Sequence, residues 1–75
     1  MEKVVEDRQY MIDAVVVRIM KTRKTMGHTD LVNEALAQLR VPIKVPELKR
    51  RIDTLIEREY MKRDEQNQKL YHYLA

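Results

Sequence analysis

The stretch Val15-Val16-Val17-Arg18-Ile19-Met20-Lys21-Thr22-Arg23-Lys24 decides how this chain folds. An α-helix turns about 100° per residue, and at that spacing the stretch and the residues before it form an apolar face. That face consists of Ile12, Val15, Val16, Ile19 and Met20. The other side carries Ala14, Val17 and Lys21, with Arg18 and Lys24 beside them. The pattern predicts a helix that packs on a core through its apolar face and exposes Lys21 to water.

The composition predicts one small globular domain without disulfide bonds. The chain has 75 residues, of which 44% are hydrophobic and 36% charged, a balance typical of folded proteins. It has four tyrosines but no phenylalanine or tryptophan, so its core must consist mainly of Ile, Leu, Val and Met. Because it has no cysteine, it can form neither a disulfide framework nor a thiolate metal site.

We expect neither a metal ion nor a cofactor, and no association with a membrane. His28 and His72 are far apart in the sequence, and neither stands in a recognisable metal-ligand spacing. We expect His28 to be a packed or capping residue and His72 to lie on an exposed strand face. No apolar run approaches the roughly 20 residues that cross a bilayer. The chain has no serine or cysteine nucleophile. Four of its aspartates, Asp13, Asp30, Asp53 and Asp64, have no paired partner at a telling spacing. A catalytic role is therefore not expected.

Two helices are predicted in the first half of the chain. The first should run from about Asp7, as N-cap, to Met26, and Gly27 should end it as a left-handed residue. Residues 1–6 are expected to be a linker or to continue a helix from upstream. Thr29 or Asp30 can cap a second helix, which should end near Leu39–Arg40.

A third helix and a β-hairpin are predicted in the second half. The connector Val41–Pro46 contains two prolines, which exclude a continuous helix, and Pro46 suits the first turn of a helix that runs to about Tyr60. The third helix should bury Leu48, Ile52, Leu55 and Ile56. At the end of the chain, the residue pattern changes from the helical period to the two-residue period of a β-strand.

The hairpin should consist of Met61–Asp64, a turn at Glu65–Gln68, and Lys69–Leu74. We expect Tyr71 and Tyr73 to face inward. The predicted fold class is therefore mainly α with a small β-hairpin, a single winged-helix domain over residues 1–75. In this plan a three-helix bundle, whose last two helices form a helix-turn-helix, is followed by a wing.

Winged helices often bind DNA through the third helix, so nucleic acid is an alternative partner. The net charge is +3, and the natural contacts would be Lys49, Arg50 and Arg51. Acidic residues on the same helix oppose this interpretation, and no outward Asn or Gln is placed to read adenine. We prefer the interpretation that this face of the third helix is solvated and carries mixed charge.

Three segments resemble those of one family. The run from Ile12 to Lys24 is similar to the modification helix of the cullins, the scaffold proteins of ubiquitin ligases. It contains the motif Arg-Ile-Met-Lys, whose last residue is Lys21. Ile52–Asp64 and the ending Tyr71–Ala75 also resemble cullin segments, in the family's order and spacing. The short connector before the third helix resembles that of the fourth cullin class. Relatives often have a small and then a β-branched residue where this chain has Val15 and Val16.

The resemblance implies that Lys21 accepts the ubiquitin-like modifier Nedd8 and that the domain is a non-catalytic part of a RING-type ubiquitin ligase. It also implies a longer chain that ends at Ala75. The implied partners are the RING subunit, Nedd8 with its conjugating enzyme, and a deconjugating complex. The implied location of the protein is the cytoplasm and nucleus, and no homo-oligomer is expected. We expect Val17, Arg18 and Lys24 to help present Lys21.

Overall fold

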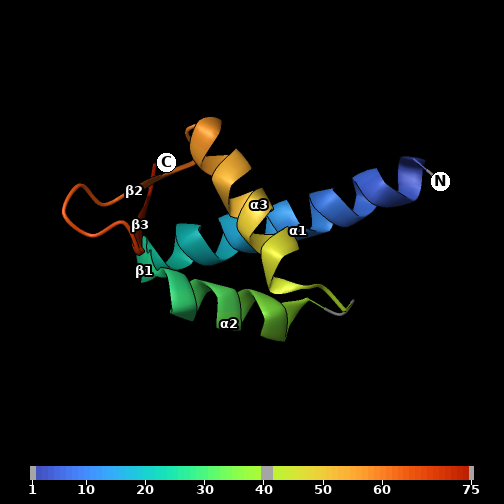
Figure 1. The fold of residues 1–75 in the computed structure, drawn as a ribbon, viewed down its shortest axis with the longest axis horizontal. Coiled ribbons are helices and arrows are strands. Elements are labelled where there is room, and N and C mark those ends of the chain that lie inside the picture. Colours follow the sequence, from blue (N-terminus) through green and yellow to red (C-terminus); the bar gives the residue numbers. More distant parts are fainter. Residues whose placement is uncertain (1, 40–41, 75) are drawn as a thin grey trace.

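The computed structural model describes residues 2–39 and 42–74, with side chains from residue 8 onward. The elements in chain order are α1 (Glu2–Arg23), β1 (Thr25–Gly27), α2 (His28–Gln38), α3 (Val45–Glu57), β2 (Met61–Arg63) and β3 (Leu70–Tyr73). Figure 1 shows α1 running along the molecule, α2 and α3 packed against it, and the small sheet at the end where α1 finishes. The three helices and the hairpin predicted from the sequence are present.

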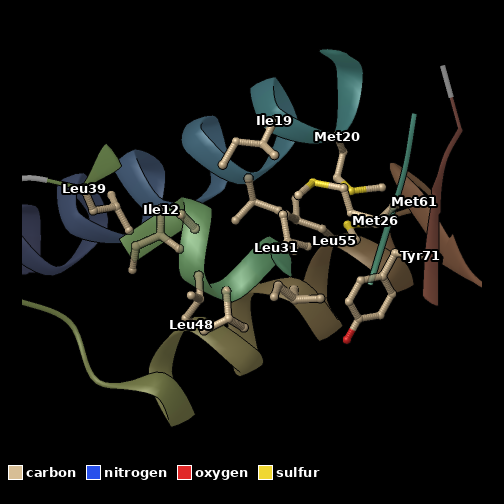
Figure 2. Close-up of a cluster of buried hydrophobic side chains, with 14 residues drawn as sticks. Ile12, Ile19, Met20, Met26, Leu31, Leu39, Leu48, Leu55, Met61 and Tyr71 are labelled. Carbon is tan, nitrogen blue, oxygen red and sulfur yellow. The ribbon is translucent and has the colours of Figure 1, made fainter. Parts of the chain in front are cut away.

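One hydrophobic core joins all three helices and the sheet (Figure 2). The predicted apolar face of α1 is buried at Ile12, Val16, Ile19 and Met20, while Val15 is half-buried at its margin. The other helices and the strands complete the core with Leu31, Val32, Ala35, Leu48, Ile52, Leu55, Met61 and Tyr71. Val17 was expected to stand outside, but it is half-buried and packs against the core.

The end of α1 differs from the prediction. The helix ends at Arg23, because Lys24 takes the left-handed conformation with φ of 70° and its N–H bonds the carbonyl of Met20 at 2.7 Å. Gly27 was expected in that role, but its φ is −72° and it belongs to a strand. A Cβ at Gly27 would meet nothing closer than 3.8 Å, so the position does not require glycine.

The helix starts also differ from the prediction. Helix α1 begins at Glu2, so Asp7 is not its N-cap. The segment 2–6, expected to be a linker or to continue a helix from upstream, is helical. Gly27, not Thr29 or Asp30, is the N-cap of α2, since pairing of β1 with β3 carries the chain to the helix in extended backbone. Helix α2 ends at Gln38 with Leu39 as its C-cap, close to the predicted end. Arg40 and Val41, where the connector was predicted to start, lie outside the described residues.

Helix α3 begins as predicted, with Pro46 in its first turn, but ends at Glu57 and not near Tyr60. Glu59 is left-handed, with φ of 64°, and its N–H bonds the carbonyl of Ile56 at 3.0 Å. This turn redirects the chain into β2.

The sheet has three antiparallel strands in the order β1-β3-β2, one more than the predicted hairpin. Strand β1 pairs with β3 through Thr25↔His72 and Met26↔Tyr71. Tyr71 is 2% exposed, which confirms its inward orientation, and Tyr73 is half-buried against the core. The end of α1 is therefore held directly on the sheet.

Candidate modification site

Lys21 lies in the last turn of α1, where the backbone is anchored and the side chain is free. Ile19 and Met20 are 3% and 0% exposed, so this turn is fixed on the core. Lys21 itself is exposed, as the sequence predicted. Within residues 2–39 and 42–74, its amine has no hydrogen-bond or ion-pair partner. The arrangement presents a primary amine to solvent from a rigid support.

The basic residues around Lys21 are engaged with α2. Arg18 donates from Nη2 to Oε1 of Gln38 at 2.8 Å, and Arg23 lies 3.3 Å from the carboxylate of Glu34. The hydroxyl of Thr22 donates to the carbonyl of Arg18 at 3.0 Å. These exposed contacts contribute little to stability individually, but they direct two guanidinium groups toward α2.

Lys24 was expected on the helix beside Lys21, and this placement is wrong. Its left-handed backbone takes it out of α1, and its carbonyl accepts a hydrogen bond of 2.7 Å from the N–H of Tyr73. Its Nζ lies 5.1 Å from the centroid of the Tyr73 ring. Sequence reasoning missed this pairing, because a strand of three residues gives no period that would reveal β1 beside β3.

The basic start of α3 does not form a continuous cationic surface. Lys49 and Arg50 are exposed, but Arg51 binds the carboxylate of Asp13 through Nε at 2.8 Å and Nη2 at 2.6 Å. The hydrogen bond to Asp13 raises the pKa of Arg51 above its ordinary value, and burial opposes this shift. Arg51 is thus an internal link between α1 and α3, which removes one of the three contacts that DNA binding would use.

The two histidines contribute to structure. His28 begins α2, and its Nδ1 lies 2.8 Å from the hydroxyl of Tyr71, which agrees with the predicted packed histidine. His72 was expected to be an inconspicuous exposed residue, but it is half-buried and bonded on both ring nitrogens. Its Nε2 lies 2.7 Å from Asp64 and its Nδ1 lies 3.0 Å from the hydroxyl of Thr25. His72 therefore joins β1 to the hairpin turn.

Two further groups, Asp64 and Tyr71, have shifted pKa values. The hydrogen bond from His72, followed by backbone N–H groups of the turn, lowers the pKa of Asp64. Burial raises the pKa of Tyr71. Neither group lies next to Lys21 in the sequence.

Among the residues that the structure describes, no group of three or more His, Asp or Glu side chains is placed to hold a metal ion. Within the same part of the chain, none of the helices combines the length and the apolar character needed to cross a membrane.

Comparison with known proteins gives consistent matches over nearly the whole chain. A family model described as the cullin protein neddylation domain matches residues 7–67. Cullin-4A of Homo sapiens is 57% identical over 74 residues, which are 99% of this chain and 10% of that protein. Cullin-4 of Caenorhabditis elegans is 51% identical over 74 residues, again 99% of this chain and 9% of that protein. The chain spans about a tenth of the length of the curated relatives it matches.

A solved structure is similar over the same range. It concerns a dual E3 mechanism for Rub1 ligation to Cdc53 and contains Dcn1 and the WHB part of Cdc53. The TM-score is 0.89 and the sequence identity 41%, with 99% of this chain and 87% of that chain covered.

The three helices, the sheet and this structural match define a winged-helix domain. The chain belongs to the cullin family, and the matched segment is its neddylation domain. The similarity to Cullin-4 proteins confirms the resemblance to the fourth cullin class that the short connector suggested.

Proposed function

We propose that Lys21 is the acceptor of Nedd8 in a cullin scaffold of a RING-type ubiquitin ligase. The observation that carries the proposal is an exposed amine, without a partner among the described residues, on the anchored last turn of α1. This position lies inside the segment that matches the cullin neddylation domain. A fixed backbone limits the positions that the amine must search before it reacts.

The chemistry required of this chain is a nucleophilic amine. The unprotonated amine of Lys21 attacks the carbonyl carbon of the thioester that joins the C-terminal glycine of Nedd8 to its conjugating enzyme. The carbon–sulfur bond breaks, the enzyme leaves as a thiolate, and the amine loses a proton as the isopeptide bond forms. The domain supplies the nucleophile and its position, while the partner enzymes supply the activated acyl group.

The residues next to Lys21 form a presentation surface in this proposal. Arg18 stands one turn before Lys21 and is exposed, and half-buried Val17 lies between that turn and the core. Lys24 contributes by ending α1 directly after the turn that carries Lys21. A partner that approaches Lys21 would meet Arg18, while Lys24 acts through the end of the helix and not through contact with the partner.

The proposed partner set rests on membership of the cullin family. The matched Cdc53 structure concerns Rub1 ligation and includes Dcn1, which supports partners of the Nedd8-ligation type for this chain. We extend the proposal to a RING subunit that holds the charged conjugating enzyme, and to a complex that removes the modifier. Modification would activate ubiquitin transfer by the assembled ligase, in the cytoplasm and nucleus, without formation of a homo-oligomer.

The deciding experiment is a conjugation reaction in vitro. The full-length protein with its RING subunit is combined with Nedd8, its activating enzyme and its conjugating enzyme, and adducts are mapped by mass spectrometry. The unchanged protein, Lys21→Arg and the control Lys62→Arg, another exposed lysine, are compared. One adduct on Lys21, lost only in Lys21→Arg, is the expected result. Absence of an adduct on Lys21 in folded, RING-bound protein would refute the assignment.

A further inference from the structure

We propose that Tyr73 of β3 is a positioning residue that makes the modification selective for Lys21 over Lys24. The inference rests on the proposed acceptor role of Lys21. The two lysines are three residues apart, and in an uninterrupted helix residues at that spacing share a face. An enzyme that reached one amine would then reach the other, so some feature of the fold must separate them.

The backbone provides the first separation. Lys24 is left-handed, and that conformation is fixed from both sides: its N–H bonds the carbonyl of Met20, and its carbonyl accepts the N–H of Tyr73, each at 2.7 Å. A left-handed residue directs its side chain away from the helix face that its predecessors occupy. The side chain of Lys24 therefore points toward the sheet and away from the helix face that carries Lys21.

The aromatic ring provides the second separation. Nζ of Lys24 lies 5.1 Å from the Tyr73 ring centroid, inside the range of about 6 Å over which a cation is attracted to an aromatic face. The ring is half-buried against the core, so it offers a fixed platform. This contact holds the amine of Lys24 on the ring. The position of the Lys24 amine therefore opposes its reaction.

Lys21 lacks any such restraint among the described residues, since no ring, carboxylate or carbonyl there contacts its amine. A cation–π contact at an exposed site favours the docked lysine by a factor of about two to five. Removal of the ring should therefore raise the reactivity of Lys24 by about that factor and leave Lys21 unchanged.

The test uses Tyr73→Leu, which removes the ring but keeps an apolar side chain for packing, and Tyr73→Phe, which keeps the ring and removes only the hydroxyl. Both are made in the Lys21→Arg background, where Lys24 can be followed without its competitor. The rate of Nedd8 adduct formation on Lys24 is measured by mass spectrometry in the RING-bound protein. We expect an increase of about two- to fivefold in the leucine variant and no increase in the phenylalanine variant.

A second readout does not depend on any enzyme. The intact chain and its two Tyr73 variants are labelled briefly with an acetylating ester, and the ratio of labelled Lys24 to labelled Lys21 is determined. The ratio should rise about two- to fivefold in Tyr73→Leu and stay constant in Tyr73→Phe. Because loss of structure would also free Lys24, circular dichroism of each variant checks that the fold is retained.

The outcomes separate the two proposals. If Lys21 receives no Nedd8 in the unchanged protein, the acceptor role fails, while the acetylation ratio still tests the contact between Tyr73 and Lys24. If Lys21 is modified but the leucine variant changes neither the Lys24 adduct rate nor the labelling ratio, the selectivity role of Tyr73 is overturned and the acceptor role stands.

Discussion

Arg51 of α3 holds Asp13 of α1 in a bidentate ion pair, with Nε 2.8 Å and Nη2 2.6 Å from the two carboxylate oxygens. The two side chains are 16% and 18% exposed, far less than those of the other Arg–carboxylate pairs of the described residues. Two parallel charge-assisted hydrogen bonds fix both distance and orientation. This pair therefore sets how α3 lies on α1, in addition to the apolar core between them.

Loss of one partner should destabilise the fold. Arg51→Ala leaves the carboxylate of Asp13 largely removed from water without its counterion, at a cost of about 2–3 kcal/mol in the free energy of unfolding. Urea denaturation followed by circular dichroism measures this cost. Arg50→Ala, an exposed neighbour on the same helix, is the control and should change the free energy by less than about 0.5 kcal/mol. Equal effects of the two variants would show that the pair contributes nothing specific.

Glycine at position 59 should stabilise the domain. Glu59 is exposed and has φ of 64°, a conformation that costs an L-residue about 1 kcal/mol and glycine almost nothing. Glycine also makes the unfolded chain more flexible, and this offsets part of the gain. Glu59→Gly should therefore raise the free energy of unfolding by about 0.5 kcal/mol. Thermal and urea unfolding check this gain. Arg50→Gly, inside α3, should instead lose about 1 kcal/mol, and a loss at both positions would contradict the argument.

The stability of the hairpin turn should depend on pH through Asp64. The carboxylate accepts a hydrogen bond from Nε2 of His72 at 2.7 Å and from the N–H groups of Gln66 and Asn67, each at 3.0 Å, and these bonds lower its pKa. A carboxyl group with a lowered pKa in the folded state stabilises the fold above its unfolded pKa, near pH 4, and loses this contribution as pH falls.

Asp64→Asn should therefore be less stable than the unchanged protein at about pH 5, and the difference should shrink by about pH 3. Urea midpoints at the two pH values measure this change. Glu65→Gln removes the same charge from the adjacent exposed position and serves as the control. A difference between Asp64→Asn and the unchanged protein that stays constant with pH would exclude the proposed role of the carboxylate.

Arg18→Ala should slow conjugation at Lys21 without unfolding the domain. Arg18 is exposed one turn before Lys21, and its guanidinium is held by Oε1 of Gln38 at 2.8 Å. A charge at the edge of a contact surface acts mainly on the association rate, so the rate of adduct formation should fall about two- to fivefold and lose part of its salt dependence. Lys49→Ala removes an equal charge from α3 and should have no effect. Undiminished rates with Arg18→Ala would exclude Arg18 from the presentation surface.

Helices were predictable because their apolar residues recur at the helical period. Ile12, Val16 and Ile19 share one face of α1 in any context that offers a core, and the structure buries all three. The ends of the helices were less predictable. The only glycine was assigned the left-handed turn after α1, yet that conformation occurs at Lys24, where hydrogen bonds to Met20 and Tyr73 hold it.

The candidate site, like the helices, was predictable from the sequence only in part. The exposure of Lys21 follows from its place opposite the apolar face, and the motif that contains it indicated the family. The separation of Lys24 from Lys21 did not follow, because it depends on a tyrosine 49 positions further along the chain. The pairing of Arg51 with Asp13 was equally hidden, since sequence spacing carries no information on contacts between helices.

By itself, the sequence determined that three amphipathic helices precede a hairpin, that Lys21 faces water and that the chain resembles a cullin. Local periodicity and residue chemistry decide these properties, and both can be read along the chain. Tertiary structure alone decided that Thr25–Gly27 becomes a strand, that Lys24 leaves the helix for the ring of Tyr73 and that Arg51 turns inward to Asp13. Each of these depends on groups brought together by burial of the shared core, and contacts between distant residues exist only after the core has formed.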